Sequence, residues 1–319
     1  MISRNVVALA GGVGGAKLAD GLAQVLPADA LTVIVNTGDD FEHFGLHISP
    51  DLDTVCYTLA GLANPETGWG LADESWNAMQ AVDRLGGPTW FRLGDRDLGT
   101  HLERTRRLKA GEALSSITRD FCRALGVAVR VLPMSDQPVA TRVATRELGE
   151  LDFQEYFVRH AYRPEVTGFR FAGIESARPA AGVLEALDAA NVVIICPSNP
   201  WVSIAPILAV PGLRERVARK PVVAVSPIVG GRALKGPAAK MYAELGIQPS
   251  AAAVAQHYGS LLSGFVLDRE DAAQTAQIEQ WGIISYVADT VMGNGEDRRR
   301  LAEEVLSFVN DLLRRTQAQ

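Results

Sequence analysis

Short runs of consecutive apolar and β-branched residues recur along the chain, and each is followed by a polar or Gly/Pro-rich stretch. Hydrophobicity in these runs is continuous rather than alternating, which indicates strands buried on both faces, as in a parallel sheet covered by helices. Runs of this kind predict strands at residues 5–10, 31–35, 128–132, 192–195, 222–225, 264–267 and 283–287.

Helical periodicity follows several of these runs, at residues 16–25, 237–245, 272–281 and 298–313. Strands that alternate with helices in this way are typical of βαβ units, in which each crossover helix covers one face of the sheet. The pattern therefore predicts an α/β fold built on a doubly wound, mostly parallel, Rossmann-like sheet.

Two regions interrupt the alternation. Residues 55–125 are far more than one crossover needs, so we interpret them as an inserted, mainly helical subdomain. Residues 138–173 form a small accessory β region with expected strands at 139–145 and 154–159. We expect residues 1–319 to form a single Rossmann-like domain that carries both additions.

The composition of the chain excludes some classes of protein. Its 319 residues are 47% hydrophobic and 21% charged, which excludes intrinsic disorder. The net charge of −6 argues against nucleic acid as a partner, because affinity for phosphate backbones comes mostly from Lys and Arg. No apolar run approaches the roughly 18 residues of a membrane-spanning helix, so no membrane association is expected. Any bound phosphate must then be held locally, by glycine loops, helix N-termini or a metal ion.

The cysteines and the N-terminal residues indicate the cellular compartment of the protein. Cys56, Cys122 and Cys196 are far apart and odd in number, and they form neither a disulfide framework nor a C-x-x-C metal pair. The apolar stretch near the N-terminus runs straight into glycines, with no cleavage site of the kind that follows a signal peptide. We expect a cytoplasmic protein.

The first predicted strand ends in Gly-Gly-Val-Gly-Gly-Ala-Lys at 11–17. Ligands of open α/β sheets bind beyond the carboxyl ends of the strands, where a helix N-terminus offers free N–H groups to anions. Gly12, Gly14, Gly15 and Lys17 are therefore candidate phosphate ligands. The spacing is neither G-x-x-x-x-G-K-[ST] nor a strict G-x-G-x-x-G. Tight packing between strand and helix is the structural alternative.

The second predicted strand is followed by Asp39, Asp40, Asp51 and Asp53. Four aspartates so close in sequence repel one another unless a cation or a proton intervenes, and hard carboxylate oxygens suit Mg²⁺. Asp51 or Asp53 alternatively caps a helix expected at 54–62. Capping does not explain all four, so we expect at least one of them to bind metal.

Two later strand ends carry Ser198 and Asn199, and Ser226 and Gly230. Both loops are rich in Pro or Gly and suit a phosphate or the edge of a base. Nucleophilic catalysis by Ser198, Ser226 or Cys196 is disfavoured, because the chain has no G-x-S-x-G elbow and no histidine that is evidently a partner. The inserted region adds a dense alternation of charge at 92–97, which is unusual for a plain surface loop. A solvated cluster of salt bridges without a function is the alternative explanation.

Taken together, six motifs resemble one family, the 2-phospho-L-lactate transferases of coenzyme F-420 biosynthesis, which are also called phosphoenolpyruvate transferases. The motifs are Gly-Gly-Val-Gly-Gly-Ala-Lys at 11–17, Asn-Thr-Gly-Asp-Asp at 36–40, Pro-Asp-Leu-Asp-Thr at 50–54, Leu-Gly-Asp-Arg-Asp at 93–97, Pro-Ser-Asn-Pro at 197–200 and Ser-Pro-Ile-Val-Gly-Gly at 226–231. The resemblance covers nearly the whole chain, and Gly-Trp-Gly at 68–70 is more similar to the bacterial members.

The resemblance implies a Mg²⁺-dependent transferase. A terminal ribityl hydroxyl of the deazaflavin Fo (7,8-didemethyl-8-hydroxy-5-deazariboflavin) would attack the phosphorus that carries the enolpyruvyl or lactyl group of a guanosine diphospho donor, and GMP would leave. It also implies a homodimer. The bacterial character favours the enolpyruvyl donor, although no pocket residue read from the sequence distinguishes the donors.

The resemblance also assigns roles to residues. Asp39 would hold Mg²⁺ with Asp51 or Asp53, and Asp51 and Asp53 are the catalytic candidates, with Asp53 holding or deprotonating the Fo hydroxyl. The residues expected at Fo are Asp53, Arg92, Asp95 and Arg96. The residues expected at the guanosine diphosphate are Gly12, Gly14, Gly15, Lys17, Ser198, Asn199, Ser226 and Gly230.

Two other functions remain as alternatives. One is a Rossmann-like regulatory protein that binds a nucleotide sugar without catalytic activity, which would lack the motifs at 93–97 and 226–231. The other is an NAD-dependent dehydrogenase, disfavoured because G-x-G-x-x-G is absent and the excess of carboxylates opposes a dinucleotide without metal.

Overall fold

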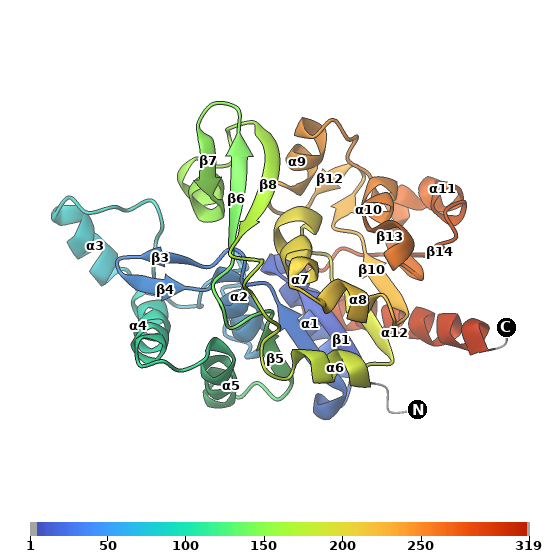
Figure 1. Ribbon diagram of the computed structural model, residues 1–319, viewed down its shortest axis with the longest axis horizontal. Coiled ribbons are helices and arrows are strands. Elements are labelled where there is room, and N and C mark those ends of the chain that lie inside the picture. Colours follow the sequence, from blue (N-terminus) through green and yellow to red (C-terminus); the bar gives the residue numbers. More distant parts are fainter. Residues whose placement is uncertain (1–4, 318–319) are drawn as a thin grey trace.

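Seven parallel strands form the central sheet of the computed structural model, which describes residues 5–317 (Figure 1). In chain order they are β1 (Val6–Ala10), β2 (Leu31–Val35), β5 (Arg130–Pro133), β9 (Val192–Ile195), β10 (Val222–Val225), β13 (Gly264–Asp268) and β14 (Ile284–Ala288). Across the sheet the order is β14-β13-β10-β9-β1-β2-β5. Each strand coincides with one of the predicted apolar runs, so the predicted fold class is confirmed.

The continuous hydrophobicity of the strands is explained by helices on both faces of the sheet. Val6 and Ala8 pack into one core, whereas Val7 and Leu9 pack into the other, because successive side chains of a strand point to opposite faces. The first core is covered by α1 (Gly12–Val25), α2 (Pro50–Leu59), α5 (Leu114–Ala124) and α12 (Gly295–Gln317). The second is covered by α6 (Val183–Ala189), α7 (Ala205–Ala209), α8 (Leu213–Val217), α9 (Ala238–Glu244), α10 (Ala251–Tyr258) and α11 (Thr275–Glu279).

Strand order reverses at β1. The chain runs outward through β2 and β5 on one side of β1, and through β9, β10, β13 and β14 on the other. In open α/β sheets this reversal opens a crevice at the carboxyl ends of the strands, where ligands bind. The loops that follow β1, β2, β9 and β10 all reach this crevice.

The region between β2 and β5 begins with a hairpin that the sequence analysis did not predict, β3 (Phe41–His43) with β4 (Leu46–Ile48). After α2 come α3 (Asn77–Arg84) and α4 (Asp95–Lys109), and α5 completes the region. In Figure 1 the hairpin and α3 project away from the central sheet.

A second, three-stranded antiparallel sheet has the order β7-β6-β8, with β6 (Ala140–Thr145), β7 (Gly149–Asp152) and β8 (Val166–Ala172) (Figure 1). The prediction of a strand at 154–159 is wrong, because Glu155–Arg159 forms a π-helical turn. Phe153, Tyr156 and Phe157 are spaced as on a helix, and they pack together against the apolar side of this sheet.

Helix α1 begins at Gly12 rather than at residue 16, so the glycines form its first turn instead of a loop before it. The remaining elements are short: 3-10 turns at Ala28–Ala30, Gly259–Leu261 and Arg269–Gln274, a π-helical turn at Pro200–Ile204, and the hairpin β11 (Ile228–Val229) with β12 (Arg232–Ala233). Part of the helix expected at 272–281 is therefore a 3-10 turn.

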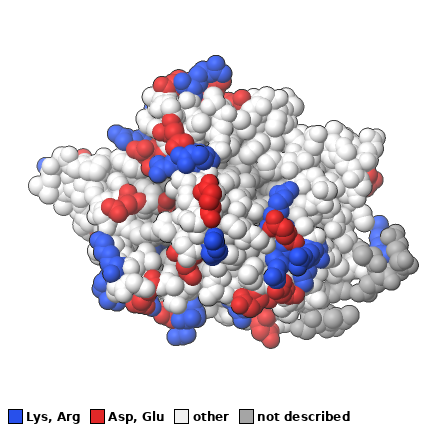
Figure 2. Space-filling view, in the orientation of Figure 1, with Lys and Arg blue, Asp and Glu red and all other residues white. Residues whose placement is uncertain are grey.

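Basic and acidic side chains are interspersed on the face drawn in Figure 2. Of the helices within residues 5–317, none combines the length and the apolar character needed to cross a membrane.

Candidate functional site

The crevice at the reversal point holds a cavity of about 680 Å³. It contains ten of the residues singled out from the sequence, which are Gly12, Gly14, Lys17, Asp39, Asp51, Asp53, Arg92, Ser198, Asn199 and Ser226. Four others, Gly15, Asp95, Arg96 and Gly230, do not line it. The tertiary structure therefore gathers most of the candidates around one space, although Gly12 and Ser226 are more than 200 positions apart in the chain.

Asp39 and Asp51 are buried side by side, and both accept a hydrogen bond from the Asn36 amide. The Asn36 Nδ2 atom is 3.3 Å from Asp39 Oδ1 and 2.9 Å from Asp51 Oδ2. Gln154 Nε2 donates to Asp39 at 3.1 Å, and the Gly12 amide donates to Asp51 at 2.7 Å. Within residues 5–317, neither carboxylate forms an ion pair with Lys, Arg or His.

Two adjacent carboxylates without a cation are unfavourable in their charged forms. Burial, together with the charges of Asp51 and Asp40, raises the pKa of Asp39 well above its usual range. Burial likewise raises the pKa of Asp51 to about 7, although the hydrogen bonds from Asn36 and Gly12 act in the opposite direction. The pair fits a divalent cation such as Mg²⁺, which takes one or two carboxylates and would replace the missing positive charge.

Neither Asp51 nor Asp53 caps α2, the helix they were expected to precede. Helix α2 begins at Pro50, with Ser49 in the N-cap position, so both aspartates lie inside the first turn. Their side chains bond elsewhere, Asp51 to the start of α1 and Asp53 to α4. The capping interpretation is therefore wrong for both.

Asp53 has a different environment from Asp39 and Asp51, because it is paired with cationic groups. Both terminal nitrogens of Arg104 hydrogen-bond its carboxylate, one of them at 3.0 Å, and His101 Nδ1 lies 3.7 Å away. Burial raises the pKa of Asp53, and Arg104 and His101 oppose that shift. The two carboxylate environments of this cavity are thus distinct, one without a cation and one already neutralised.

Helix α4 supplies the partners of Asp53 from one face. Asp97, His101 and Arg104 are four and three residues apart, so they lie above one another along the helix. His101 Nε2 is 3.3 Å from Asp97, and the Tyr57 hydroxyl donates to Asp97 at 2.7 Å. Asp53, Asp97 and His101 are also close enough for one ligand atom of each to reach a common metal ion. The ion pair with Arg104 makes this a poorer cation site than Asp39 and Asp51.

The glycines at the start of α1 allow close packing within the protein. A Cβ atom on Gly14 would lie 2.2 Å from the carbonyl oxygen of Pro197, and one on Gly15 would lie 2.4 Å from Ser198 Oγ. Gly12 has φ +65°, a conformation that L side chains rarely adopt, and it directs its N–H to Asp51. Tight packing therefore accounts for Gly15. Gly14 packs closely and also faces the cavity, whereas Gly12 faces the cavity and is required by its backbone conformation.

The polar side chains of the loops after β9 and β10 hold nearby backbone in place, Ser198 that of the loop after β1 and Asn199 and Ser226 that of their own loops. Ser198 Oγ accepts from the Gly11 amide at 3.1 Å, and Asn199 Oδ1 accepts from the Trp201 amide at 3.0 Å. The Ser226 hydroxyl donates to the Ile228 carbonyl at 2.7 Å. These residues shape the wall of the cavity with their side chains already bonded.

Lys17 brings positive charge to the lining of the cavity. Its Nζ atom donates to the Met292 carbonyl at 2.6 Å and faces the cavity. Burial lowers the pKa of Lys17, and the nearby charges of Arg298 and Lys235 lower it further. Lys17 and Lys235 line the same cavity as the two carboxylates, which suits a diphosphate held by cationic side chains and by a metal ion on the carboxylates.

The charged motif at 92–97 is divided between the cavity and the supporting structure. Arg92 lines the cavity with its guanidinium 4.2 Å from the centre of the Trp76 ring. The Asp95 carboxylate accepts from Ser75 and from the Asn77 and Ala78 amides, so it holds the start of α3. The Arg96 side chain donates to the carbonyl of residue 72.

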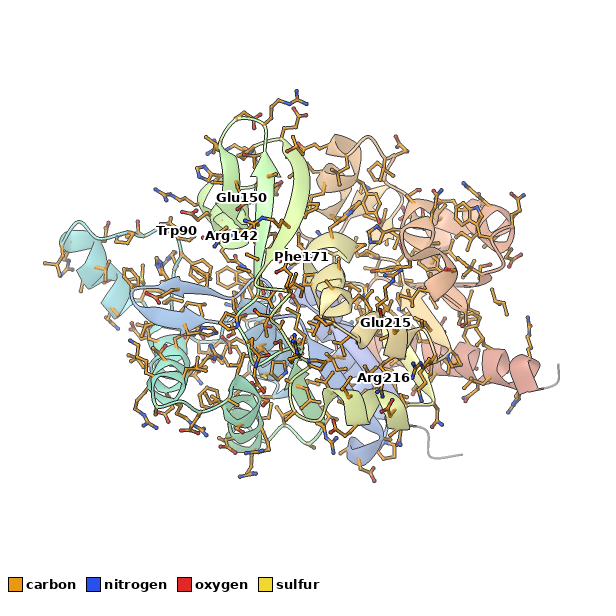
Figure 3. All side chains as sticks on the ribbon, in the orientation of Figure 1. Trp90, Arg142, Glu150, Phe171, Glu215 and Arg216 are labelled. Atoms are coloured by element: carbon orange, nitrogen blue, oxygen red, sulfur yellow. The ribbon has the colours of Figure 1, made fainter. Side chains whose placement is uncertain are left out.

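The aromatic residues of the inserted region behave differently from one another. Trp69 lines the cavity and is 49% exposed. Trp90 lies beside the β3–β4 hairpin, where its ring centre is 5.1 Å from that of His43 (Figure 3). Phe91, next in the chain, lines the cavity, so of these three rings Trp69 and Phe91 face it and Trp90 does not.

Several residues of the site carried no role in the sequence analysis. Arg104, His101 and Asp97 share one helix face, and their spacing is the signal that could have shown this. Asn36 directly follows β2, as residues of such sites do. Gln154 reaches Asp39 from the accessory region, 115 positions away, and no local pattern marks it.

Comparisons with known proteins agree with the geometry. The family model described as 2-phospho-L-lactate transferase CofD matches residues 6–302. The chain is 45% identical over 314 residues to a phosphoenolpyruvate transferase of Streptomyces griseus, covering 96% of this chain and 99% of that protein. It is 39% identical over 303 residues to a 2-phospho-L-lactate transferase of Methanosarcina acetivorans, covering 95% and 98%.

The fold is shared more widely. A crystal structure of a UPF0052 family member from Bacillus halodurans superposes with a TM-score of 0.64 at 15% identity, covering 96% of this chain and 99% of that one. Identity this low shows a common fold alone. The match of the family model over nearly the whole chain and the identities of 39% and 45% establish more, and this chain belongs to the 2-phospho-L-lactate transferase CofD family.

Proposed function

We propose that this protein transfers a phosphoenolpyruvyl group from a guanosine diphospho donor to the terminal ribityl hydroxyl of Fo and releases GMP, in coenzyme F-420 biosynthesis. The observation that carries the proposal is the pair Asp39 and Asp51, which are buried without a cationic side-chain partner among the described residues, beside a cavity of about 680 Å³ that Lys17 also lines. The names of the Streptomyces relatives favour the enolpyruvyl donor, and the 2-phospho-L-lactyl group is the alternative.

In this proposal Asp39 and Asp51 hold Mg²⁺. The bound ion would neutralise negative charge on the diphosphate, which is its usual contribution to phosphoryl transfer. Asn36 keeps the two carboxylates side by side, and the Gly12 amide orients Asp51. Lys17 and the first turn of α1, which also line the cavity, would contact the diphosphate.

In this proposal Asp53 holds the acceptor. Arg104 fixes the orientation of its carboxylate, which lines the cavity and accepts a hydrogen bond from the ribityl hydroxyl of Fo. The hydroxyl oxygen forms a bond to the phosphorus that bears the enolpyruvyl group, the bond from that phosphorus to the GMP oxygen breaks, and the hydroxyl proton passes to Asp53. Such a transfer depends mainly on positioning and charge neutralisation.

The apolar wall and Arg92 would receive the deazaflavin ring. Trp69 and Phe91 offer flat surfaces, and Arg92 offers a charged hydrogen-bond donor. The homodimer and the cytoplasmic location stay predictions from the resemblance and from the cysteine pattern.

The direct test is to incubate the purified protein with Fo, Mg²⁺ and each guanosine diphospho donor in turn. GMP release should accompany a deazaflavin whose mass has increased by the transferred group. Asp53→Asn should abolish turnover and keep the fold, whereas Asp83→Asn, on the exposed side of α3, should turn over normally. Lack of product with every donor would overturn the proposal.

A further inference from the structure

Two buried thiols that the proposed chemistry does not use lie directly behind Asp53. Cys56 on α2 and Cys122 on α5 are each 5% exposed, and their sulfur atoms are 3.5 Å apart, within hydrogen-bond distance. They are 66 positions apart in the chain, so nothing in the sequence indicates that they lie together. Cys196, the third cysteine, is buried elsewhere, at the end of β9.

The thiol pair adjoins the acceptor side of the site. Cys56 is one helical turn beyond Asp53 on α2, and Phe121, the neighbour of Cys122, lies with its ring centre 5.9 Å from the Arg104 guanidinium. Asp53, Cys56, Arg104 and Phe121 together surround a small void. A change in the distance between the two sulfurs would therefore act on the pair Asp53 and Arg104.

We propose that Cys56 and Cys122 form a reversible disulfide that links α2 to α5 and lowers the activity of the site by displacing Asp53 and Arg104. The sulfurs must approach from 3.5 Å to about 2.05 Å, and Cys56 borders the small void that Asp53 and Arg104 also line. Disulfides of cytoplasmic proteins are usually transient and redox-sensing, which fits a linkage made and broken at this position.

The oxidant is a small peroxide, and the reaction balances with one equivalent. Cys122 attacks one peroxide oxygen to give a sulfenic acid and a first water, and the sulfur of Cys56 then attacks that sulfenic sulfur and releases a second water. The hydrogen bond from Cys56 lowers the pKa of Cys122, which favours Cys122 as the attacking sulfur. A dithiol reductant reverses the reaction.

The first experiment needs no activity. The reduced 319-residue chain is treated with one equivalent of hydrogen peroxide, unfolded, alkylated and mapped by mass spectrometry. We expect an intact mass lower by two hydrogen atoms, one linked peptide pair containing Cys56 and Cys122, and alkylated Cys196. Recovery of all three cysteines as alkylated thiols, a linkage through Cys196, or over-oxidised sulfur in place of the linkage would each overturn the disulfide.

The second experiment measures its effect, and it rests on the proposed transfer activity. The oxidised chain should turn over about a hundredfold more slowly, the scale of loss for a displacement of about 1 Å, and dithiothreitol should restore the rate. Cys122→Ala should make turnover insensitive to peroxide, whereas Cys196→Ala should leave it sensitive. A mapped disulfide with an unchanged rate would overturn the regulation alone, and a reduced chain with no turnover would overturn the proposed function while the mapping stands.

Discussion

The guanidinium of Arg104 forms two hydrogen bonds with the carboxylate of Asp53, and both side chains are buried, at 3% and 7% exposure. This ion pair separates Asp53 from its neighbour Asp51, only two residues earlier on the same helix, which has no cationic partner among the described residues. Similar aspartates in one motif thus acquire different roles: Asp51 suits a metal ion, and Asp53 suits the acceptor hydroxyl.

Removal of Arg104 should destabilise the fold. Arg104→Met leaves Asp53 as an uncompensated buried charge, and breaking a buried pair in this way costs about 3–5 kcal/mol. The measurement is the free energy of unfolding in urea. The control is Arg106→Met, because Arg106 pairs with Glu103 on the exposed side of the same helix and its loss should have no measurable effect. Equal unfolding curves for the two variants would contradict a structural role for the buried pair.

Stability without metal should fall as the pH rises, through Asp51. Its pKa is raised to about 7 in the folded chain, against about 3.9 when unfolded. A carboxyl group whose folded pKa is raised contributes stability that is fully present below the unfolded pKa and is lost as the pH rises through the folded pKa. The thermal midpoint of the parent chain should therefore decrease more between about pH 5 and about pH 8 than that of Asp51→Asn.

Mg²⁺ provides the control for that experiment. A bound cation neutralises the carboxylates, so saturating Mg²⁺ should reduce the loss of stability in the parent chain and leave Asp51→Asn almost unchanged. If the thermal midpoints of the parent and the variant change with pH in parallel, with and without Mg²⁺, Asp51 is not a metal ligand.

A methyl group at Gly14 should disrupt the cavity. In Gly14→Ala the new Cβ would meet the Pro197 backbone at 2.2 Å, so α1 or the loop after β9 must move, at a cost of about 1–3 kcal/mol. We expect weaker binding of GDP by calorimetry as well as lower stability. Gly99→Ala is the matched control, because that helical glycine meets nothing within 4 Å and its replacement should stabilise α4 by up to about 1 kcal/mol. If Gly14→Ala is as stable as Gly99→Ala, the close approach of Gly14 to the Pro197 backbone does not require glycine at position 14.

Arg92 should matter for Fo where Arg96 does not. Arg92→Met removes a charged donor from the cavity wall and should raise the KM for Fo by about tenfold, the equivalent of one charged hydrogen bond, with little change in the KM for the donor. Arg96→Met should leave both KM values near those of the parent, because its side chain does not line the cavity. Steady-state kinetics with each substrate varied in turn distinguishes the two variants. A larger increase in the KM for Fo in Arg96→Met than in Arg92→Met would contradict the assignment of Arg92 to the Fo site.

Local pattern predicted the central sheet because a strand covered on both faces must be apolar at every position. The same reasoning wrongly predicted a strand at 154–159, because residues there have high β propensity. Phe153, Tyr156 and Phe157 instead follow a helical period. It also placed the start of α1 four residues late, because a run of glycines reads as a loop. Here they form the first turn of a helix that packs directly on neighbouring backbone.

The sequence by itself determined the fold class, the order of the strand ends and the residue types that gather beyond them. Only the tertiary structure decided which of those residues act together. Arg104 pairs with Asp53 across 51 positions, and Gln154 reaches Asp39 across 115. The physical reason is that the charge state of a carboxylate depends on burial and on partners brought close by folding. A linear pattern therefore places four aspartates in one loop region but leaves open which one is neutralised by arginine and which two lie without a cation.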